Sequence, residues 1–337
     1  MAEIKLIDKV RQVLSQSQGR DIDLMQLRKE LNIDPASPSW EGLRVILHRL
    51  CEGETPILRT TGRKDGTYHV ITQVKPVSVF GSSRERRPPC ILIFPKDRDT
   101  QLEMYPAEQV VVREGDMLLI AGRSNYGKTA LCMNFLGENI DKHPVLMGNE
   151  YTVIGESGEF EPAPRFLSRL DNMKWIEWTN GDGMDKFTLL PVRDDYASHI
   201  QKDKINIIDW INVDTGEHYM IGTILEQIKR RLGKGIAIVA IQKAEGAAIG
   251  RGGQFTQDFA DCELLIDALG KEEILLTMGK VKESKTRMYG KTYGYSLRHG
   301  VEVTNFREVG TCPQCKGKGW SMNQLCDKCK GKKYVDI

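Results

Sequence analysis

The sequence has no apolar run long enough to cross a membrane and almost no net charge. Hydrophobic residues fill 40% of the 337 positions, and a bilayer needs about 18 in succession. The start, MAEIKLIDKVRQ, is polar, so we expect neither a signal peptide nor a membrane partner. The 48 basic and 46 acidic residues exclude a uniformly basic nucleic-acid coat, although local patches are possible. We therefore expect a soluble, cytoplasmic protein.

Four of the eight cysteines lie in one short segment, and the other four are scattered. The scattered cysteines are Cys51, Cys90, Cys132 and Cys262. We expect them to be small buried residues in a reducing compartment. The clustered cysteines form two CxxC pairs with ten residues between them: Cys312, Cys315, Cys326 and Cys329. Four thiolates at this spacing favour a closed, tetrahedral structural zinc site over a redox dithiol.

Residues 1–74 predict three helices followed by a β-hairpin. Apolar residues recur at helical spacing over 4–16, Asp23 suits the N-cap of a second helix, and Ser39 suits that of a third. An Asp65-Gly66 turn joins two short strands. The order resembles the winged helix-turn-helix family, which implies a recognition helix over 39–52. Candidate DNA contacts are Arg44, His48, Arg49, Arg59, Arg63 and Lys64. Basic and acidic residues nearly balance here, so protein docking is the alternative.

Residues 75–90 have the Gly, Ser, Pro and Arg content of an exposed linker. Residues 91–308 alternate apolar strands with helical stretches, which predicts an α/β domain with a mostly parallel sheet. In it, a strand runs into a G-x-x-x-x-G-K-[ST] loop and then a helix. The expected nucleotide-binding residues are Gly122, Arg123, Ser124, Asn125, Tyr126, Gly127, Lys128, Thr129 and Ala130. In this motif, backbone amides cradle phosphates, the lysine neutralises them, and the threonine ligates Mg²⁺.

Two strand ends supply the acidic groups that a phosphate loop needs for hydrolysis. The apolar run INII ends in Asp209, the position of a Walker B carboxylate that holds Mg²⁺. Asp214 is a competitor, but it lies beyond the strand. Upstream, the strand in HPVLMGNEYT ends near Glu150, which is either the general base for the attacking water or a surface carboxylate.

Together these motifs resemble the RecA-like ATPases, in the branch of the DnaB helicases, RadA-type proteins and KaiC. The resemblance implies a RecA-like P-loop core that uses ATP and Mg²⁺, with Glu150 as the catalytic glutamate and Gln242 as the γ-phosphate sensor. It also implies a homo-oligomer, as a hexameric ring or a filament, that binds single-stranded DNA. A Gly-rich loop precedes a Gln-Asp-x-Ala-Asp segment at 257–261, as in the helicases. Lys243 and Arg251 are therefore DNA-loop candidates, and a flexible loop without DNA contact is the alternative.

The same resemblance places Lys280 and Lys282 where a Lys-x-Arg pair of a neighbouring subunit completes the ATP site. A lysine cannot make the planar bidentate contact of an arginine. Either hydrolysis is slow, or the arginine finger, the basic residue with which the neighbouring subunit completes the ATP site, is Arg287 or a residue elsewhere.

The cysteine pairs resemble the CxxCxGxG repeats of DnaJ-type chaperones and the knuckles of zinc ribbons, which implies Zn²⁺. The first pair matches through Gly319, whereas the second departs at Lys333. Lysines alternate here with Trp320 and Tyr334, a pattern that suits phosphate contact and base stacking. The alternative is that these lysines solubilise the segment and offset the charge of the metal centre.

The sequence thus predicts four segments: a winged helix (1–74), a linker (75–90), a RecA/DnaB-like ATPase domain (91–308) and a zinc-binding module (309–337). The expected function is an ATP hydrolase, most simply a DnaB-like helicase or translocase in DNA replication or recombination, in a bacterial or phage-infected cell. Replication or recombination proteins are its expected partners. One alternative is a RecA/RadA-like recombination mediator or helicase loader, and another is a KaiC-like signalling ATPase.

Overall fold

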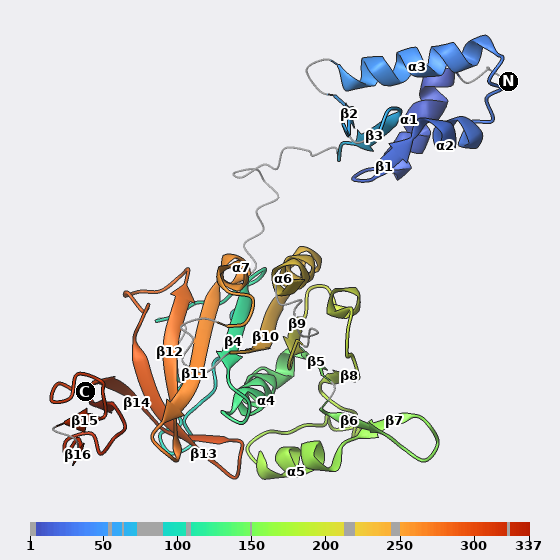
Figure 1. Ribbon diagram of the computed structural model, residues 1–337. Coiled ribbons are helices and arrows are strands. Elements are labelled where there is room, and N and C mark those ends of the chain that lie inside the picture. The colour runs from blue at the N-terminus through green and yellow to red at the C-terminus, as the bar shows by residue number, and fades with distance from the viewer. Residues whose placement is uncertain are drawn as a thin grey trace. The chain divides into compact units, whose positions relative to one another are not determined.

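The computed structural model describes residues 5–52, 56–62, 64–72, 90–105, 109–148, 150–211, 220–243, 250–321 and 324–337. They belong to two compact units, one within residues 1–86 and the other within 87–337 (Figure 1). Among these residues, no helix is both long enough and apolar enough to cross a bilayer.

The smaller unit has three helices and a three-stranded antiparallel sheet in the order β1-β3-β2. Its elements are α1 (Leu6–Gln16), β1 (Asp21–Asp23), α2 (Leu24–Glu30), α3 (Pro38–Cys51), β2 (Leu58–Thr60) and β3 (Thr67–Val70). Asp23 caps α2 as expected, because its side chain accepts a hydrogen bond from the backbone amide of Met25. The N-cap of α3 is Ser37 and not Ser39, since Pro38 occupies the first turn, where its missing N–H costs nothing. The strand β1 was not predicted.

The larger unit is built on a ten-stranded sheet in the order β17-β14-β13-β12-β11-β4-β10-β9-β5-β8. The strands from β11 to β8 pair in parallel, and those from β12 to β17 extend the sheet in antiparallel pairing. The parallel strands are β4 (Met117–Gly122), β5 (Val145–Met147), β8 (Thr188–Leu190), β9 (Ile205–Ile208), β10 (Ile236–Gln242) and β11 (Cys262–Leu269). The antiparallel ones are β12 (Glu273–Val281), β13 (Thr292–Arg298), β14 (Glu302–Thr311) and β17 (Tyr334–Asp336). The predicted α/β class with a mostly parallel core is confirmed.

Helices cover both faces of this sheet, so its central strands are apolar on both sides. On one face, Leu118 and Ile120 of β4 pack in the cluster that holds Leu131 of α4. On the other, Leu119 of β4 shares a cluster with Leu225 of α6. The helices are α4 (Lys128–Glu138), α5 (Pro164–Asn172), α6 (Met220–Arg231) and α7 (Gln254–Phe259), with short 3-10 turns at Ile140–Lys142 and Tyr196–His199.

The segment 148–204, for which the sequence suggests no role, holds a small hairpin of β6 (Thr152–Ile154) and β7 (Phe160–Pro162) before α5. Trp175 receives the Arg98 guanidinium over its ring at 4.4 Å. Trp178 packs edge-on against Phe187 at 5.8 Å between ring centroids. These aromatic residues therefore have packing roles.

Residues 309–337, called the cysteine module below, are joined to the sheet at both ends. The strand β14 continues to Thr311, and β17 returns beside it, with Gly310 opposite Val335. Between them lies a minimal hairpin of β15 (Trp320–Ser321) and β16 (Gln324–Leu325). The module is therefore an extension of the same sheet (Figure 1).

Candidate functional site

The phosphate loop lies between β4 and α4, as its sequence predicts. Asn125 and Gly127 adopt positive φ angles of 65° and 84°, which turn the chain sharply into the helix. A β-carbon at Gly127 would lie 2.8 Å from the end of the Leu297 side chain, so a larger residue would also force that side chain to move. The first amides of α4 have no helical partner and so can bind an anion.

Lys128 is buried at the start of α4, and its ammonium donates to the carbonyl oxygen of Arg123 at 2.8 Å. Burial lowers the pKa of this lysine, while the nearby charge of Asp209 opposes that shift. The side chain thus curls over its own loop, where its charge faces the space that a phosphate would fill.

Asp209 follows β9 and is fully buried. The Tyr151 hydroxyl donates to its Oδ2 at 2.6 Å. Its Oδ1 is buried and has no hydrogen-bond partner among the described residues. Burial raises the pKa of Asp209, and the hydroxyls of Tyr151 and Thr129 partly counter that rise. A buried carboxylate oxygen without a partner beside a threonine hydroxyl is a ligand set that suits Mg²⁺.

Glu150 and Gln242 lie at the same end of the parallel strands. Glu150 is exposed beyond β5. Its negative charge opposes the lowering of the Lys128 pKa by burial and adds to the raising of the Asp209 pKa by burial, so the three groups lie near one another. Gln242 is the last residue of β10 and pairs with Gly122 of β4. Asp214 lies outside the described residues. The loop, Asp209, Glu150 and Gln242 therefore converge at the carboxyl edge of the sheet, where α/β proteins bind ligands.

The two DNA-loop candidates differ in environment, and residues 244–249 between them lie outside the described ranges. Arg251 is exposed, and its backbone amide donates to the Gln242 carbonyl at 2.8 Å. Lys243 is buried, and its ammonium forms an ion pair with Asp267. In this structure Lys243 is therefore not available to DNA, contrary to the expectation from the sequence.

The finger candidates lie away from the phosphate loop of their own chain. Ile266 of β11 pairs with Gly122 at the loop end, while Cys262 pairs with Val281 at the opposite end. Four residues of strand separate these positions by about 13 Å. Lys280 donates to the carbonyl of Gln257 at 2.6 Å. Neither Lys280 nor the exposed Lys282 can thus complete the site of its own chain. Arg287 is exposed in the connection after β12.

Asp261, which the sequence placed beside the DNA loop, holds three elements together. Its Oδ2 accepts hydrogen bonds from the Met117 amide at 2.7 Å and from the Lys229 ammonium at 2.5 Å. Its Oδ1 accepts a hydrogen bond from the Lys282 ammonium at 2.6 Å. Burial alone would raise the pKa of Asp261, but these donors hold it below its ordinary value. This residue therefore joins β4, α6 and the end of β12.

In the smaller unit, most candidate DNA contacts are exposed on α3 and the hairpin. Arg44 lies over the ring of Trp40 at 5.0 Å, and Arg49 is exposed. Lys64 forms an ion pair with Asp23 at 3.3 Å. Arg63 lies outside the described residues. Exposure on α3 fits either DNA contact or protein docking.

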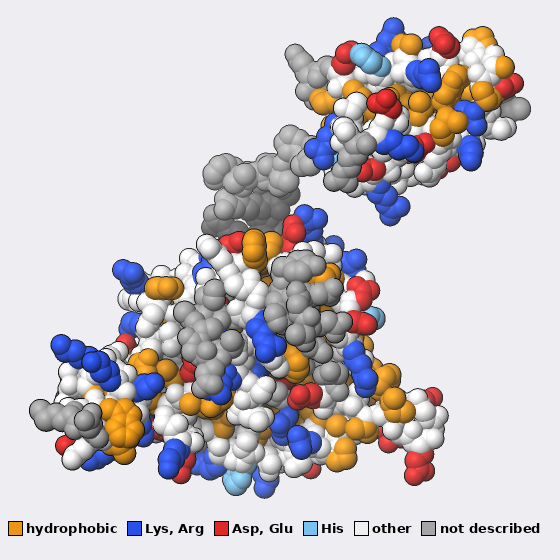
Figure 2. Space-filling model, viewed as in Figure 1, with side chains coloured by type: hydrophobic (Ala, Val, Ile, Leu, Met, Phe, Trp, Pro, Cys, Tyr) orange, Lys and Arg blue, Asp and Glu red, His pale blue; other side chains and the backbone are white. Residues whose placement is uncertain are grey.

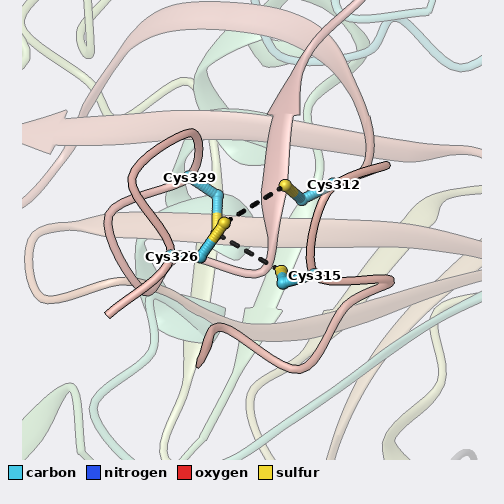
Figure 3. Close-up of side chains that lie close together, drawn as sticks. All are labelled: Cys312, Cys315, Cys326 and Cys329. Atoms are coloured by element: carbon cyan, nitrogen blue, oxygen red, sulfur yellow. Dashed lines mark hydrogen bonds between the residues drawn. The ribbon is translucent and has the colours of Figure 1, made fainter. Parts of the chain in front are cut away.

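The four clustered cysteines converge as predicted (Figure 3). Their sulfur atoms lie within 4.8 Å of one another, and all four side chains are buried. The Sγ atoms of Cys312 and Cys326 are 3.8 Å apart, and those of Cys315 and Cys329 are 3.6 Å apart. A regular tetrahedron with Zn–S bonds of about 2.3 Å has S···S edges of about 3.8 Å. The cluster therefore has the dimensions of a zinc site.

The two knuckles affect their thiols differently. Burial opposes ionisation of Cys315, but the Gly319 amide, 3.3 Å from its sulfur, and the neighbouring thiols lower its pKa to about 7. Burial and the Cys315 thiol raise the pKa of Cys329 to about 11. The two thiols thus lose their protons in sequence. Gly319 and Lys333, at equivalent places of the two repeats, both have positive φ, at 82° and 71°.

No family model matches this chain, and no curated protein matches it. Among solved structures, it is similar to a KaiC-like protein from the hyperthermophilic archaeon Pyrococcus horikoshii OT3, with 14% identity over 64% of this chain and 99% of that one, at a TM-score of 0.43. It is also similar to the RadB recombinase, with 13% identity over 57% of this chain and 91% of the other, at a TM-score of 0.41. These are likenesses of fold at low identity, and they assign no activity.

Proposed function

We propose that this chain is a Mg²⁺-dependent ATP hydrolase that acts on single-stranded DNA as a helicase or translocase. One observation carries the nucleotide part of this proposal. The Lys128 ammonium bonds its own phosphate loop, and the buried Asp209, with an unpartnered Oδ1 among the described residues, follows β9 at the same carboxyl edge of the parallel sheet. A purely structural loop would not need a buried carboxylate with a free oxygen beside it.

Each residue has a defined part in this reaction. The loop amides and Lys128 bind and neutralise the phosphates. Thr129 and Asp209 would hold Mg²⁺, which polarises the phosphoryl oxygens when bound. Glu150, exposed at the edge of the site, accepts a proton from the attacking water. Gln242 ends β10 beside the loop and would sense the γ-phosphate.

The DNA part of the proposal rests on how the loop of 243–257 is attached. The amide of Lys243 donates to the Gly122 carbonyl, and the amide of Arg251 donates to the Gln242 carbonyl. The backbone at Lys243 and at Arg251 is thus attached to the ends of β4 and β10, beside the phosphate loop. In the proposed motor, this attachment would couple Arg251 to the nucleotide site. A mediator or loader that uses ATP only for assembly would share this connection.

ATP turnover, measured with and without single-stranded DNA, tests the proposal. We expect DNA to stimulate turnover, Lys128→Ala to abolish it, and Glu150→Gln to slow it by about 10²- to 10⁴-fold. Glu156→Gln is the matched control, because Glu156 is an exposed carboxylate shortly after Glu150, and it should leave turnover unchanged. Normal turnover by Lys128→Ala would refute the nucleotide site. Indifference to DNA would refute the motor, and stimulation without unwinding of a fork would favour the mediator.

A further inference from the structure

We infer that the cysteine module is a second binding site for single-stranded DNA, in which Trp320 stacks on a base and lysines of the second knuckle contact the phosphates. This inference deepens the DNA part of the proposed function. It is carried by three features of the module: an exposed aromatic ring, an excess of exposed lysines, and clefts beside the second knuckle.

Trp320 is largely exposed to solvent. Its side chain is 57% exposed, and that of Leu325, its partner across the β15–β16 pair, is 53% exposed. The interior of the module consists of the four cysteines with Val335 packed against them. The ring therefore takes no part in holding the cysteines, and it offers a flat apolar face on which an unpaired base can stack.

The module also carries more positive charge than a metal centre needs. Its exposed lysines are Lys316, Lys318, Lys328, Lys330, Lys332 and Lys333. They outnumber its two aspartates together with the two net negative charges of a Zn(Cys)₄ centre. Among the described residues, only Lys332 of these six has an ion-pair partner, Glu273 at 2.6 Å. The module thus keeps a small excess of positive charge, and its lysines are exposed to solvent.

Two adjoining clefts lie between the second knuckle and the sheet. One, of about 340 Å³, is lined by Arg307, Lys328, Lys330 and Tyr334 among others. The other, of about 510 Å³, is lined by Lys271, Ser296 and Lys330 among others. Both share Leu269, Lys330 and Lys332 and so form one trough, and carboxylates also line them: Asp336 in the first, and Glu272 and Glu273 in the second. Arg307 and Lys332 are paired with these carboxylates. Lys328 and Lys330 have no ion-pair partner among the described residues, so they are the lysines of this trough that can contact phosphates.

The ring and the trough are neighbours. A β-carbon on Gly331, between Lys330 and Lys332, would lie 3.0 Å from the Leu325 side chain, and Leu325 pairs with Trp320. Figure 2 shows blue and orange side chains together over the part of the chain that carries β15 and β16. Stacking and phosphate contacts can therefore be made by one strand. Because duplex bases are already stacked on each other, this arrangement selects single-stranded DNA.

The module is also anchored against the motor sheet. Besides the pairing of β17 with β14, Arg307 bonds Asp336 at 2.7 Å and Glu273 at 2.8 Å. A strand held by Trp320 would thus be kept at a fixed place relative to the ATPase sheet.

The test is the affinity of the full-length protein for a fluorescently labelled oligo-dT strand, measured by anisotropy without nucleotide. We expect Trp320→Ala to weaken binding roughly tenfold and Trp320→Phe to restore most of it. Phe160→Ala is the matched control, because Phe160 on β7 is 51% exposed and lies outside the module. It should bind like the wild type. Zinc content checks that each variant keeps its module folded.

A double variant, Lys328→Gln with Lys330→Gln, tests the phosphate contacts independently. The slope of log affinity against log salt should fall by about 1.4, since each phosphate contact on a single strand contributes about 0.7. This variant decides the question if Trp320→Ala loses zinc. An unchanged slope, wild-type affinity of zinc-loaded Trp320→Ala, or an equal loss on duplex DNA would overturn the inference. ATP turnover without DNA should stay unchanged in all variants, so failure here is distinct from failure of the nucleotide site.

Discussion

The hydroxyl of Tyr151 donates a hydrogen bond to Oδ2 of Asp209 at 2.6 Å, and both residues are buried. The bond fixes one oxygen of the carboxylate and leaves Oδ1 without a partner among the described residues. Gly148 makes this approach possible, because a β-carbon there would lie 2.2 Å from the Asp209 carbonyl and 3.0 Å from the tyrosine ring. Tyr151 is thus a positioning residue for the carboxylate.

We expect Tyr151→Phe to raise the Mg²⁺ concentration needed for half-maximal ATP turnover about tenfold. A hydrogen bond to a charged group contributes about 1.5–3 kcal/mol, and here it orients the oxygen that would face the metal. A magnesium titration of turnover at saturating ATP measures the effect.

The matched control is Tyr105→Phe, because Tyr105 is equally buried and its hydroxyl has no partner among the described residues. It should leave the Mg²⁺ requirement unchanged. Equal effects of the two substitutions would contradict a positioning role for Tyr151.

Asp261→Asn should lower the free energy of unfolding by about 2 kcal/mol near neutral pH, because it removes the charge that Lys229 and Lys282 share. Lys282 is half exposed, so the loss stays below that of a fully buried pair. The folded pKa of Asp261 lies below its ordinary value despite burial. Its stabilisation is therefore present above the unfolded pKa of about 3.9 and is lost as pH falls through the folded pKa.

Denaturant unfolding of both proteins across the acid range measures this difference, which should shrink toward low pH. Asp258→Asn is the control, since Asp258 is exposed three residues earlier. A constant gap between Asp261→Asn and the wild type at every pH would refute the electrostatic account.

Substitutions of Lys243 and Arg251 should have different effects: the first should lower stability, and the second should lower the affinity for DNA. Lys243→Ala removes a buried ammonium paired with Asp267, so we expect a loss of roughly 2 kcal/mol in unfolding free energy. Arg251 is exposed, and Arg251→Ala should lower the affinity for single-stranded DNA and reduce the salt slope by about 0.7. Thermal unfolding and anisotropy of both variants check this. The reverse pattern would restore Lys243 as a DNA contact.

Lys333→Gly should stabilise the cysteine module by roughly 1 kcal/mol, because a lysine at a φ of 71° is in a conformation that glycine adopts without steric cost. Competition with a zinc chelator measures this, and the variant should need more chelator to release its metal. Lys328→Gly is the control, since Lys328 is not among the residues with positive φ and glycine there only adds chain entropy. Easier zinc loss from Lys333→Gly would refute this reasoning.

The parts of the site that were predictable are contiguous in sequence. The phosphate loop needs only a strand, eight residues and a helix in order. Asp209 follows from the end of an apolar strand, and Gln242 was placed by the resemblance to the RecA-like ATPases. The cysteine cluster was predictable because two short knuckles carry all its ligands.

Contacts that depend on the register of distant strands could not be predicted. Tyr151 meets Asp209 across 58 residues of sequence, and Asp261 meets Met117 across 144. Lys243 looked like any other loop lysine, because its burial depends on Asp267 of β11. Likewise, β1 has three residues and becomes a strand only because β3 lies beside it.

The separation of Lys282 from its own phosphate loop has a consequence for how activity depends on concentration. Suppose that a lysine or arginine near Lys282 completes the ATP site of a neighbouring subunit. Each chain then carries a phosphate loop at one place and a completing residue at another, and a lone chain has no complete ATP site. A closed ring of such chains would hold as many complete sites as subunits, whereas an open filament would hold one fewer. Turnover per chain should then rise steeply with protein concentration and level off once every half-site has found its complement.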